Sequence, residues 1–316
     1  MKTRRIIPVV LTLAGITALL ALGCGGDDGP TQPTIENSKL ILNFYNTPPL
    51  ASGWMYQIWT YKGGQWSAGA TFNVNANGHL VNAQGQTISG DKLTFSELDL
   101  TTCDSLQVTF GASSAAGDIN GQLVLLTAEI GTSHSPRLEA PLKEATGARD
   151  LYFIFGTPSD QTSDNELSGI WFAGVDHQSP GLDSLPDLPE GWIFEGWAYR
   201  GGVHLSTGKF SSSSGPDQNC RYYSCSAAVP AFPGEDFLQN APAGIEFPFS
   251  FDEGDTILVS LEPVDDPNPN DPFIRWHFRH LSQSTAELLQ QLQQTHYIAQ
   301  NVSPYWPAAN AFITND

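Results

Sequence analysis

Positively charged residues are scarce in this sequence. Its 316 residues include 14 Lys and Arg against 33 Asp and Glu, which gives a formal net charge of −19. Charged residues make up only 15% of the chain, where soluble domains usually carry about 25%. A strongly acidic surface with few cations repels phosphate backbones. The composition therefore excludes nucleic acid as a partner.

Long apolar runs are missing outside the N-terminus. No other segment approaches the roughly 20 apolar residues that a membrane-spanning helix needs. The HExxH and GxSxG motifs and phosphate-cradling glycine loops are absent as well. These absences leave no recognised catalytic motif, and we expect neither a cofactor nor enzymatic activity.

The first 23 residues have the features of a lipoprotein signal peptide. Lys2, Arg4 and Arg5 form a basic start, residues 6–22 are apolar, and a small Gly precedes Cys24. This order is typical of secretory signals. A Cys directly after a small residue resembles the bacterial lipobox, in which the thiol receives acyl chains such as palmitate and becomes the mature N-terminus. We predict lipid attachment at Cys24; the alternatives are an ordinary secretory signal or an uncleaved anchor.

The segment after this Cys is predicted to be a flexible tether. Residues 24–37 are rich in Gly, Pro and Thr, a composition that forms no packed core. The acyl chains would hold the protein on a membrane, while the acidic polypeptide itself is repelled by anionic lipid. We expect a lipid-anchored protein outside the cytoplasm, on the outer membrane or the cell surface.

Cysteine usage agrees with export. Cys220 and Cys225 flank a short loop that a disulfide could close in an oxidising compartment. Cys103 is left over and is expected to be a buried apolar residue. No CxxC pair is present, so a zinc site built from these thiols is not expected.

One stretch of the sequence recurs. Residues 49–64 align with residues 188–202, and both contain a Gly-Trp pair, a second Trp five residues later and then a Gly-Gly pair. The match continues into 67–69 and 206–208, and residues 104–109 resemble 255–260. We predict a duplicated domain, with a divergent first repeat at 38–147 and a second repeat at 148–280.

The repeated stretch has the pattern of a β-hairpin. An aromatic-rich strand precedes two glycines that can adopt the positive φ of a tight reversal. Further short β-branched and aromatic runs are separated by Gly, Pro, Asn and Asp, as in antiparallel sandwiches. The sequence predicts an all-β fold of two antiparallel β-sandwich domains. Expected strands outside the hairpins are residues 39–45, 93–98, 106–110, 123–130, 151–155, 170–175, 257–261 and 273–278.

A single helix is expected in the C-terminal region, residues 281–316. Ser284 and Glu287 are spaced as a capping box. Leu288, Leu289 and Leu292 supply a narrow apolar stripe after it. We predict a short helix followed by a tail.

The second repeat carries several motifs in a recognisable order. They are GIWF at 169–172, LPDLPEGWIFEGW at 185–197, STGKF at 206–210, FPGEDF at 232–237 and VSLEP at 259–263. Residues 148–280 thereby resemble the extracytoplasmic β domain of anti-sigma-K factors, while the first repeat keeps only the Trp and Gly core. The resemblance implies a β domain that senses, binds or spaces. In that family a separate cytoplasmic segment holds the sigma factor; no such segment is evident here, so no direct sigma-factor contact is expected.

Residues able to carry site chemistry are few. Asp265, Asp266 and Asp271 offer oxygens for Ca²⁺, but their irregular spacing without a Gly favours an ordinary turn. Glu235 and Asp236 could act as paired carboxylates in a hydrolase, although a solvated loop is the favoured interpretation. His277 and His280 are three positions apart on an expected strand and so face opposite sides, which argues against a shared metal.

Aromatic residues could serve the core or bind sugars. The four repeated tryptophans, Trp54, Trp59, Trp192 and Trp197, are expected in the core. Exposed candidates for stacking on sugar faces are Trp66, Tyr222, Tyr223, Tyr305 and Trp306. The leading hypothesis is a non-enzymatic envelope module that interacts with or senses an unknown envelope partner. The alternatives are a glycan-binding surface protein and an envelope hydrolase.

Overall fold

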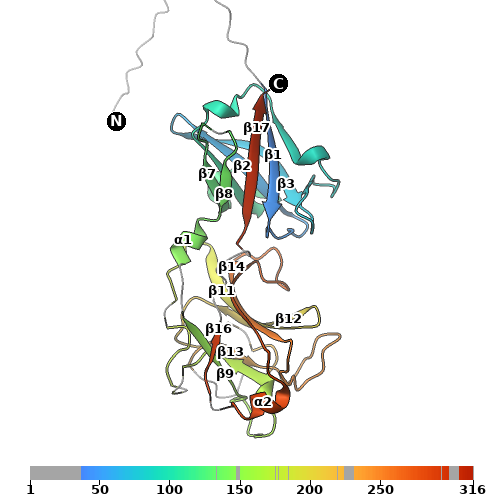
Figure 1. The fold of residues 1–316 in the computed structure, drawn as a ribbon, viewed down its shortest axis with the longest axis vertical. Coiled ribbons are helices and arrows are strands. Elements are labelled where there is room, and N and C mark those ends of the chain that lie inside the picture. Colours follow the sequence, from blue (N-terminus) through green and yellow to red (C-terminus); the bar gives the residue numbers. More distant parts are fainter. Residues whose placement is uncertain are drawn as a thin grey trace, which may run out of the picture. The chain divides into compact units, whose positions relative to one another are not determined.

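A computed structural model of the protein confirms an all-β fold. It describes residues 37–132, 134–146, 150–174, 176, 178–183, 185–218, 220–223, 231–292, 294–298 and 306–315. Residues 35–316 form one compact unit. Within the described part, strands dominate and the helices are short (Figure 1). No helix among the residues described is long and apolar enough to cross a membrane. The signal peptide, Cys24 and the tether up to residue 36 lie outside the described residues.

The first region is built on one nine-stranded antiparallel sheet. Its strand order is β4-β3-β2-β6-β7-β8-β17-β1-β5. The strands are β1 (Ser38–Tyr45), β2 (Trp54–Lys62), β3 (Gln65–Val74), β4 (Leu80–Val81), β5 (Lys92–Phe95), β6 (Ser105–Ala112), β7 (Leu123–Glu129), β8 (Arg137–Glu139) and β17 (Ala308–Asn315).

This sheet curls around its own core. Gly69 on β3 lies close to β5, the strand at the far end of the sheet, since an added Cβ at Gly69 would lie 2.7 Å from Phe95 Cε1. The enclosed space is filled by alternate residues of β1 and β6, such as Leu40, Leu42 and Val108, whose side chains are buried. A close approach of this kind requires a glycine at position 69.

The second region contains two four-stranded sheets. One has the order β13-β10-β9-β16 and the other β12-β11-β14-β15. Their strands are β9 (Leu151–Phe155), β10 (Gly169–Trp171), β11 (Trp192–Arg200), β12 (Val203–Phe210), β13 (Gly234–Asp236), β14 (Thr256–Pro263), β15 (Ile274–His280) and β16 (His296–Ile298). Phe172, directly after β10, packs on Gly196 of β11 and contacts Phe210 of β12 with ring centroids 6.1 Å apart. The two sheets therefore share a core.

Glycine pairs close both predicted hairpins. Gly63 and Gly64 join β2 to β3, and Gly201 and Gly202 join β11 to β12; all four have positive φ, between 56° and 91°. Two consecutive positive φ angles match the right-handed twist of the flanking strands, which is why two-residue hairpin loops favour glycine. The hairpin prediction is confirmed in both places.

Helices are confined to short connections. Helix α1 (Leu142–Thr146) follows β8, and α2 (Thr285–Leu289) follows β15. The predicted capping box is present, because the Ser284 and Glu287 side chains each bond the backbone of the other residue. The predicted apolar stripe is only partly correct: Leu288 is buried, whereas Leu289 is 49% exposed.

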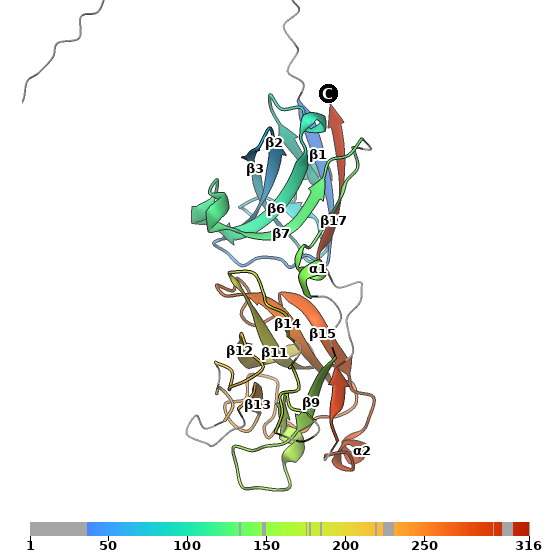
Figure 2. The same cartoon turned by 90° about the vertical axis from the view of Figure 1, so that its left-hand side faces the viewer.

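The C-terminal segment is not a tail. Residues 308–315 form β17, which pairs along its length with β1 and also with β8 (Figure 2). Ala309, Ala311 and Ile313 alternate into the core of the first sheet. The chain therefore returns to the first region at its end, and the expected boundary at residue 281 is corrected accordingly. The division into two duplicated sandwiches is not confirmed, since the first region is one continuous sheet.

Two groups of four strands share order and register. We call β3-β2-β6-β7 the first quartet and β12-β11-β14-β15 the second quartet. In the first, Trp54 pairs with Ala112 and Tyr61 with Ser105; in the second, Trp192 pairs with Pro263 and Tyr199 with Thr256. Register shifts also fall at corresponding places, after Val108 in β6 and after Val259 in β14. This likeness agrees with a duplication, whose common origin stays a prediction.

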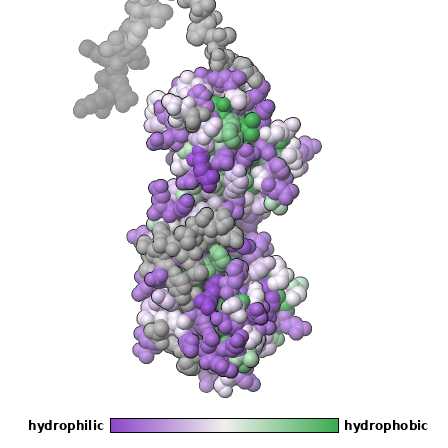
Figure 3. All heavy atoms as spheres, viewed as in Figure 1, coloured by the Kyte–Doolittle hydropathy of each residue, from purple (hydrophilic) through white to green (hydrophobic). Residues whose placement is uncertain are grey.

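Buried aromatic side chains fill both regions, while hydrophilic residues cover most of the face seen in Figure 3. Trp59, Trp192 and Trp197 are buried as predicted, and Trp54 is partly buried against the same core. The Phe110 ring of β6 contacts Phe273 with centroids 4.8 Å apart. The hydrophobic cores of the two regions are thus continuous.

Candidate functional site

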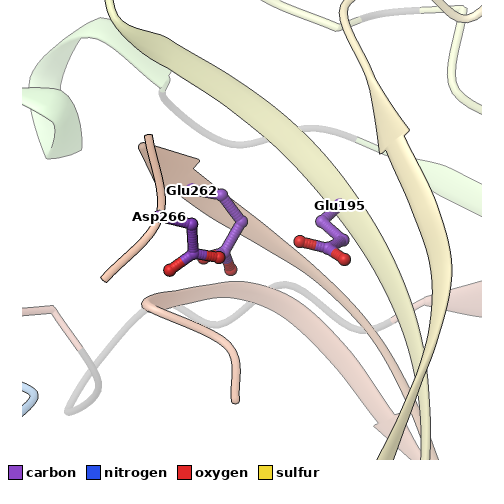
Figure 4. Close-up of side chains that lie close together, drawn as sticks. All are labelled: Glu195, Glu262 and Asp266. Atoms are coloured by element: carbon purple, nitrogen blue, oxygen red, sulfur yellow. The ribbon is translucent and has the colours of Figure 1, made fainter. Parts of the chain in front are cut away.

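Three carboxylates gather beside the second quartet. Glu195 lies on β11, Glu262 on β14, and Asp266 in the loop that follows β14. One carboxylate oxygen from each lies within 4.8 Å of the others. Figure 4 shows the Glu195 carboxylate facing those of Glu262 and Asp266. We call these three residues the carboxylate cluster.

Strand pairing explains why the two glutamates meet. Glu195 pairs with Ser260 on β14, and Glu262 lies two residues further along the same strand. Side chains two positions apart on a strand share a face, so Glu195 and Glu262 are diagonal neighbours across the pair. Glu195 is 4% exposed and Glu262 is fully buried.

Each glutamate has one hydrogen-bonded oxygen and one without a partner. The Ser206 hydroxyl donates to Glu195 Oε1. The Ser260 hydroxyl and the Phe273 backbone N–H, the latter at 2.9 Å, donate to Glu262 Oε1. Oε2 of Glu195 and Oε2 of Glu262 are buried and accept no hydrogen bond. Buried oxygens without partners are costly, so their presence calls for an explanation.

Asp266 brings a cation to the edge of the cluster. Lys209 Nζ lies 3.2 Å from Asp266 Oδ2 and donates to the Pro263 carbonyl at 3.1 Å. The other oxygen of Asp266 accepts the Asn268 backbone N–H at 2.7 Å. The Lys209 ammonium therefore pairs with Asp266, and its charge also acts to lower the pKa of Glu195.

Burial changes the acidity of both glutamates. Removal from water raises the pKa of Glu195 to about 7, against the smaller opposing effect of its Ser206 hydrogen bond. Burial also raises the pKa of Glu262 well above its usual range, and the nearby Glu195 carboxylate adds to the rise. Such a cluster either holds protons or requires additional positive charge.

Only one member of the cluster was among the predicted calcium ligands. Asp266 is there, whereas Asp265 is exposed and Asp271 Oδ1 lies 3.0 Å from His204 Nδ1. Asp266 also takes part in a turn, as the sequence favoured, because its carboxylate accepts the Asn268 backbone N–H. Glu195 and Glu262 were missed. The available signal was a lone acidic residue in each of two strands that are otherwise mostly apolar.

Glu235 and Asp236 do not lie in a solvated loop. Both are fully buried on β13. Asp236 accepts Trp171 Nε1–H at 2.6 Å and the Ser159 N–H at 2.8 Å, while Glu235 Oε2 accepts the Arg221 N–H at 3.2 Å. Burial and the Asp217 carboxylate raise the pKa of Glu235 to about 9. Both carboxylates therefore accept hydrogen bonds inside the fold, while Glu235 Oε1 is buried without a hydrogen-bond partner.

The two histidines occupy different environments. His277 is fully buried and its ring contacts Trp276 with centroids 4.4 Å apart. His280 is exposed and shares a 2.7 Å hydrogen bond with the Thr256 hydroxyl. One ring therefore lies in the core and the other at the surface of the second region.

The described cysteines follow the expected division. Cys220 is disulfide-bonded. Cys225, its predicted partner, lies outside the described residues. Cys103 is free and buried in the core of the first sheet.

The expectation of exposed aromatics is partly wrong. Tyr222 and Tyr223 are buried, at 2% and 7% exposure, because they pack on Phe237 and Trp171. Trp66 is half-buried against Tyr61, and Tyr305 lies outside the described residues.

Trp306 is half-exposed and lines a surface groove. The groove has a volume of about 390 Å³, and Tyr45, Arg137 and Asn310 also line it. Tyr45 is 48% exposed. Its hydroxyl accepts Asn310 Nδ2–H at 3.3 Å, and Arg137 Nη1 donates to Asn310 Oδ1 at 3.5 Å. Sequence reasoning missed Tyr45, which ends a strand whose alternate residues Leu40, Leu42 and Phe44 are buried in the core.

The chain was compared with models of protein families, with curated proteins and with solved structures, and none of these comparisons found a match.

Proposed function

We propose that this protein is a non-enzymatic, lipid-anchored module of the cell envelope that binds or senses a partner outside the cytoplasm. The single observation that carries the proposal is the disulfide at Cys220, because structural disulfides persist in oxidising compartments. It agrees with the signal-like N-terminus and with Cys24 as the acylated residue. The partner is an envelope protein or a glycan.

The anti-sigma-K resemblance supports the same role. The motif residues at 192–197, 206–210 and 259–263 fall on β11, β12 and β14, three of the four strands of the second quartet. Such a domain contributes a binding or sensing surface rather than a sigma-factor contact. We therefore propose no direct interaction with a sigma factor.

Fractionation of cells labelled with a clickable palmitate analogue tests the anchor. The wild-type protein is expected in the membrane fraction and labelled. Cys24→Ser is expected to lose the label and leave the membrane fraction, whereas Cys103→Ser, a matched control, should keep both. Unlabelled wild-type protein in the cytoplasm would overturn the proposal.

A specific observation favours glycan binding as a second candidate. The groove at Trp306 places two aromatic rings, those of Tyr45 and Trp306, beside the Asn46, Asn310 and Glu139 side chains. Sugar sites combine an apolar ring surface with a few polar groups that fix orientation. We call this the aromatic groove.

Retention on immobilised envelope polysaccharides tests the aromatic groove. Wild-type protein should be retarded, and Tyr45→Ala should elute earlier. Tyr152→Ala is the matched control, since Tyr152 is also exposed, at 37%, but lies on β9. Equal elution of all three proteins would exclude sugar binding in this groove.

A further inference from the structure

The carboxylate cluster has the donors of a cation site. The three oxygens all lie within 4.8 Å of one another, a separation no larger than twice the usual Ca²⁺–oxygen distance of about 2.4 Å. Two of these donors come from neighbouring strands of one sheet, and the pairing of those strands fixes where they lie. The third donor comes from the adjoining loop. The sequence alone gave no regular calcium-loop spacing here.

Unpartnered oxygens give the second, independent observation. Glu262 is fully buried and Glu195 is 4% exposed, yet Oε2 of each accepts no hydrogen bond. The other oxygen of each carboxylate, Oε1, does accept hydrogen bonds. Two unpartnered acceptors on buried carboxylates that face each other (Figure 4) are what a bound cation would satisfy.

The charge balance points to a divalent ion. Lys209 Nζ, 3.2 Å from Asp266 Oδ2, supplies one positive charge. With the three carboxylates ionised, two negative charges remain uncompensated, which is the charge of one divalent cation. Buried charges persist only when paired or bound to metal.

We propose that Glu195, Glu262 and Asp266 form a calcium site. All three donors are oxygens, which Ca²⁺ prefers, and bidentate carboxylates can fill its six to eight positions. Mg²⁺ demands near-ideal octahedral geometry and usually keeps several waters, which a buried cluster has little room to accommodate. The inference is independent of the envelope function proposed above.

Bound calcium would tie three segments together. Glu195 belongs to β11, Glu262 to β14, and Asp266 to the loop that leads to β15. The same loop reaches the first region, where Asn268 Nδ2 donates to the Pro49 carbonyl. The ion would therefore hold the loop that bridges the two regions.

Calorimetric titration and thermal unfolding of the full-length mature protein test this site. After EDTA treatment and removal of the chelator, added CaCl₂ should give a saturable heat and raise the unfolding temperature; MgCl₂ at the same concentration should raise it less. Glu262→Gln and Glu195→Gln should both lose the calcium heat and the shift. Asp271→Asn, a 72% exposed carboxylate in the same loop, should keep both.

The two Gln variants are expected to fold, so a loss of calcium binding in them would not reflect misfolding. Each Gln is the same size as the Glu it replaces and removes a buried negative charge, so in EDTA each variant should unfold at or above the wild-type temperature. Absence of calcium binding by the wild type, or binding retained by both Gln variants, would overturn the proposal. An equal response to magnesium would overturn the assignment to calcium.

Discussion

The two quartets place different chemistry at the same position. Gln57 pairs with Thr109 in the first quartet, as Glu195 pairs with Ser260 in the second. A tryptophan indole donates to each hydroxyl: Trp59 Nε1 to Thr109 at 2.8 Å, and Trp197 Nε1 to Ser260 at 2.7 Å. The scaffold is shared, and the group beside it is an amide in one case and a carboxylate in the other.

In the first quartet, both the oxygen and the nitrogen of the Gln57 amide have hydrogen-bond partners. Gln57 Oε1 accepts Gln122 Nε2–H at 2.8 Å and the Gly117 N–H at 2.9 Å, and Gln57 Nε2 donates to the Gly69 carbonyl at 3.2 Å. Amides both donate and accept, so two of them complete a buried network. Ionised carboxylates only accept, so the second quartet is left with two unpartnered carboxylate oxygens.

The first and second regions as a whole also differ in the kind of polar side chain that they bury. In the first region, the buried polar side chains among the described residues are amides and hydroxyls. In the second, they include five carboxylates: Glu195, Glu235, Asp236, Asp255 and Glu262. Sensitivity to protons and cations should therefore reside in the second region.

The largest effects should be equal in the two quartets. Trp59→Ala and Trp197→Ala each remove a buried indole and its hydrogen bond, and each should lower the free energy of unfolding by about 3–5 kcal/mol. Trp66→Ala, on a half-buried residue of the first hairpin, should cost clearly less. Urea denaturation followed by circular dichroism measures all three. If only one of Trp59→Ala and Trp197→Ala greatly lowered the free energy of unfolding, the two tryptophan positions would not be structurally equivalent.

Introducing a carboxylate should separate the quartets. Gln57→Glu places an acceptor-only group opposite the Gly69 carbonyl, which accepts the Gln57 Nε2–H in the wild type, and should cost about 1–3 kcal/mol at pH 8. Gln65→Glu, the same change at an exposed position of β3, should be nearly neutral. If Gln57→Glu is as stable as the control, the amide network is not a requirement of the first quartet.

A smaller, pH-dependent effect should come from Glu235. Its carboxyl group faces Asp217, Asp236 and the Arg221 backbone, and burial raises its pKa from 4.5 to about 9. A raised folded-state pKa contributes stability that is complete below pH 4.5 and is lost as the pH rises towards 9.

Glu235→Gln should remove this dependence. Between pH 5 and 9 the stability of this variant should fall less steeply with rising pH than that of the wild type. Glu253→Gln, at an exposed position, should leave the slope unchanged. Parallel pH profiles for wild type and Glu235→Gln would show that this carboxyl group ionises normally.

Sequence reasoning worked where local chemistry decides the structure. The glycine pairs at 63–64 and 201–202 fix both hairpins, and Ser284 with Glu287 fixes the start of α2. It failed for β17, because Ala308, Ala309 and Ala311 give no strong β signal and the strand forms only through its neighbours β1 and β8.

The carboxylate cluster shows the same limit. Asp266 stood out because it lies in a polar loop, but Glu195 and Glu262 are far apart in the sequence and meet only through the register of β11 and β14. An isolated acid in an apolar strand marks a special position without naming its partners. The solvated-loop interpretation of Glu235 and Asp236 failed for a related reason, since β13 is a short strand that local patterns do not reveal.

Export with lipid attachment is the claim on which the proposed function depends. Mass spectrometry of the N-terminal peptide of protein extracted from membranes tests it most directly. The mature chain should begin at Cys24 and carry acyl chains on that residue. A chain that retains residues 1–23 with an unmodified Cys24 would contradict it.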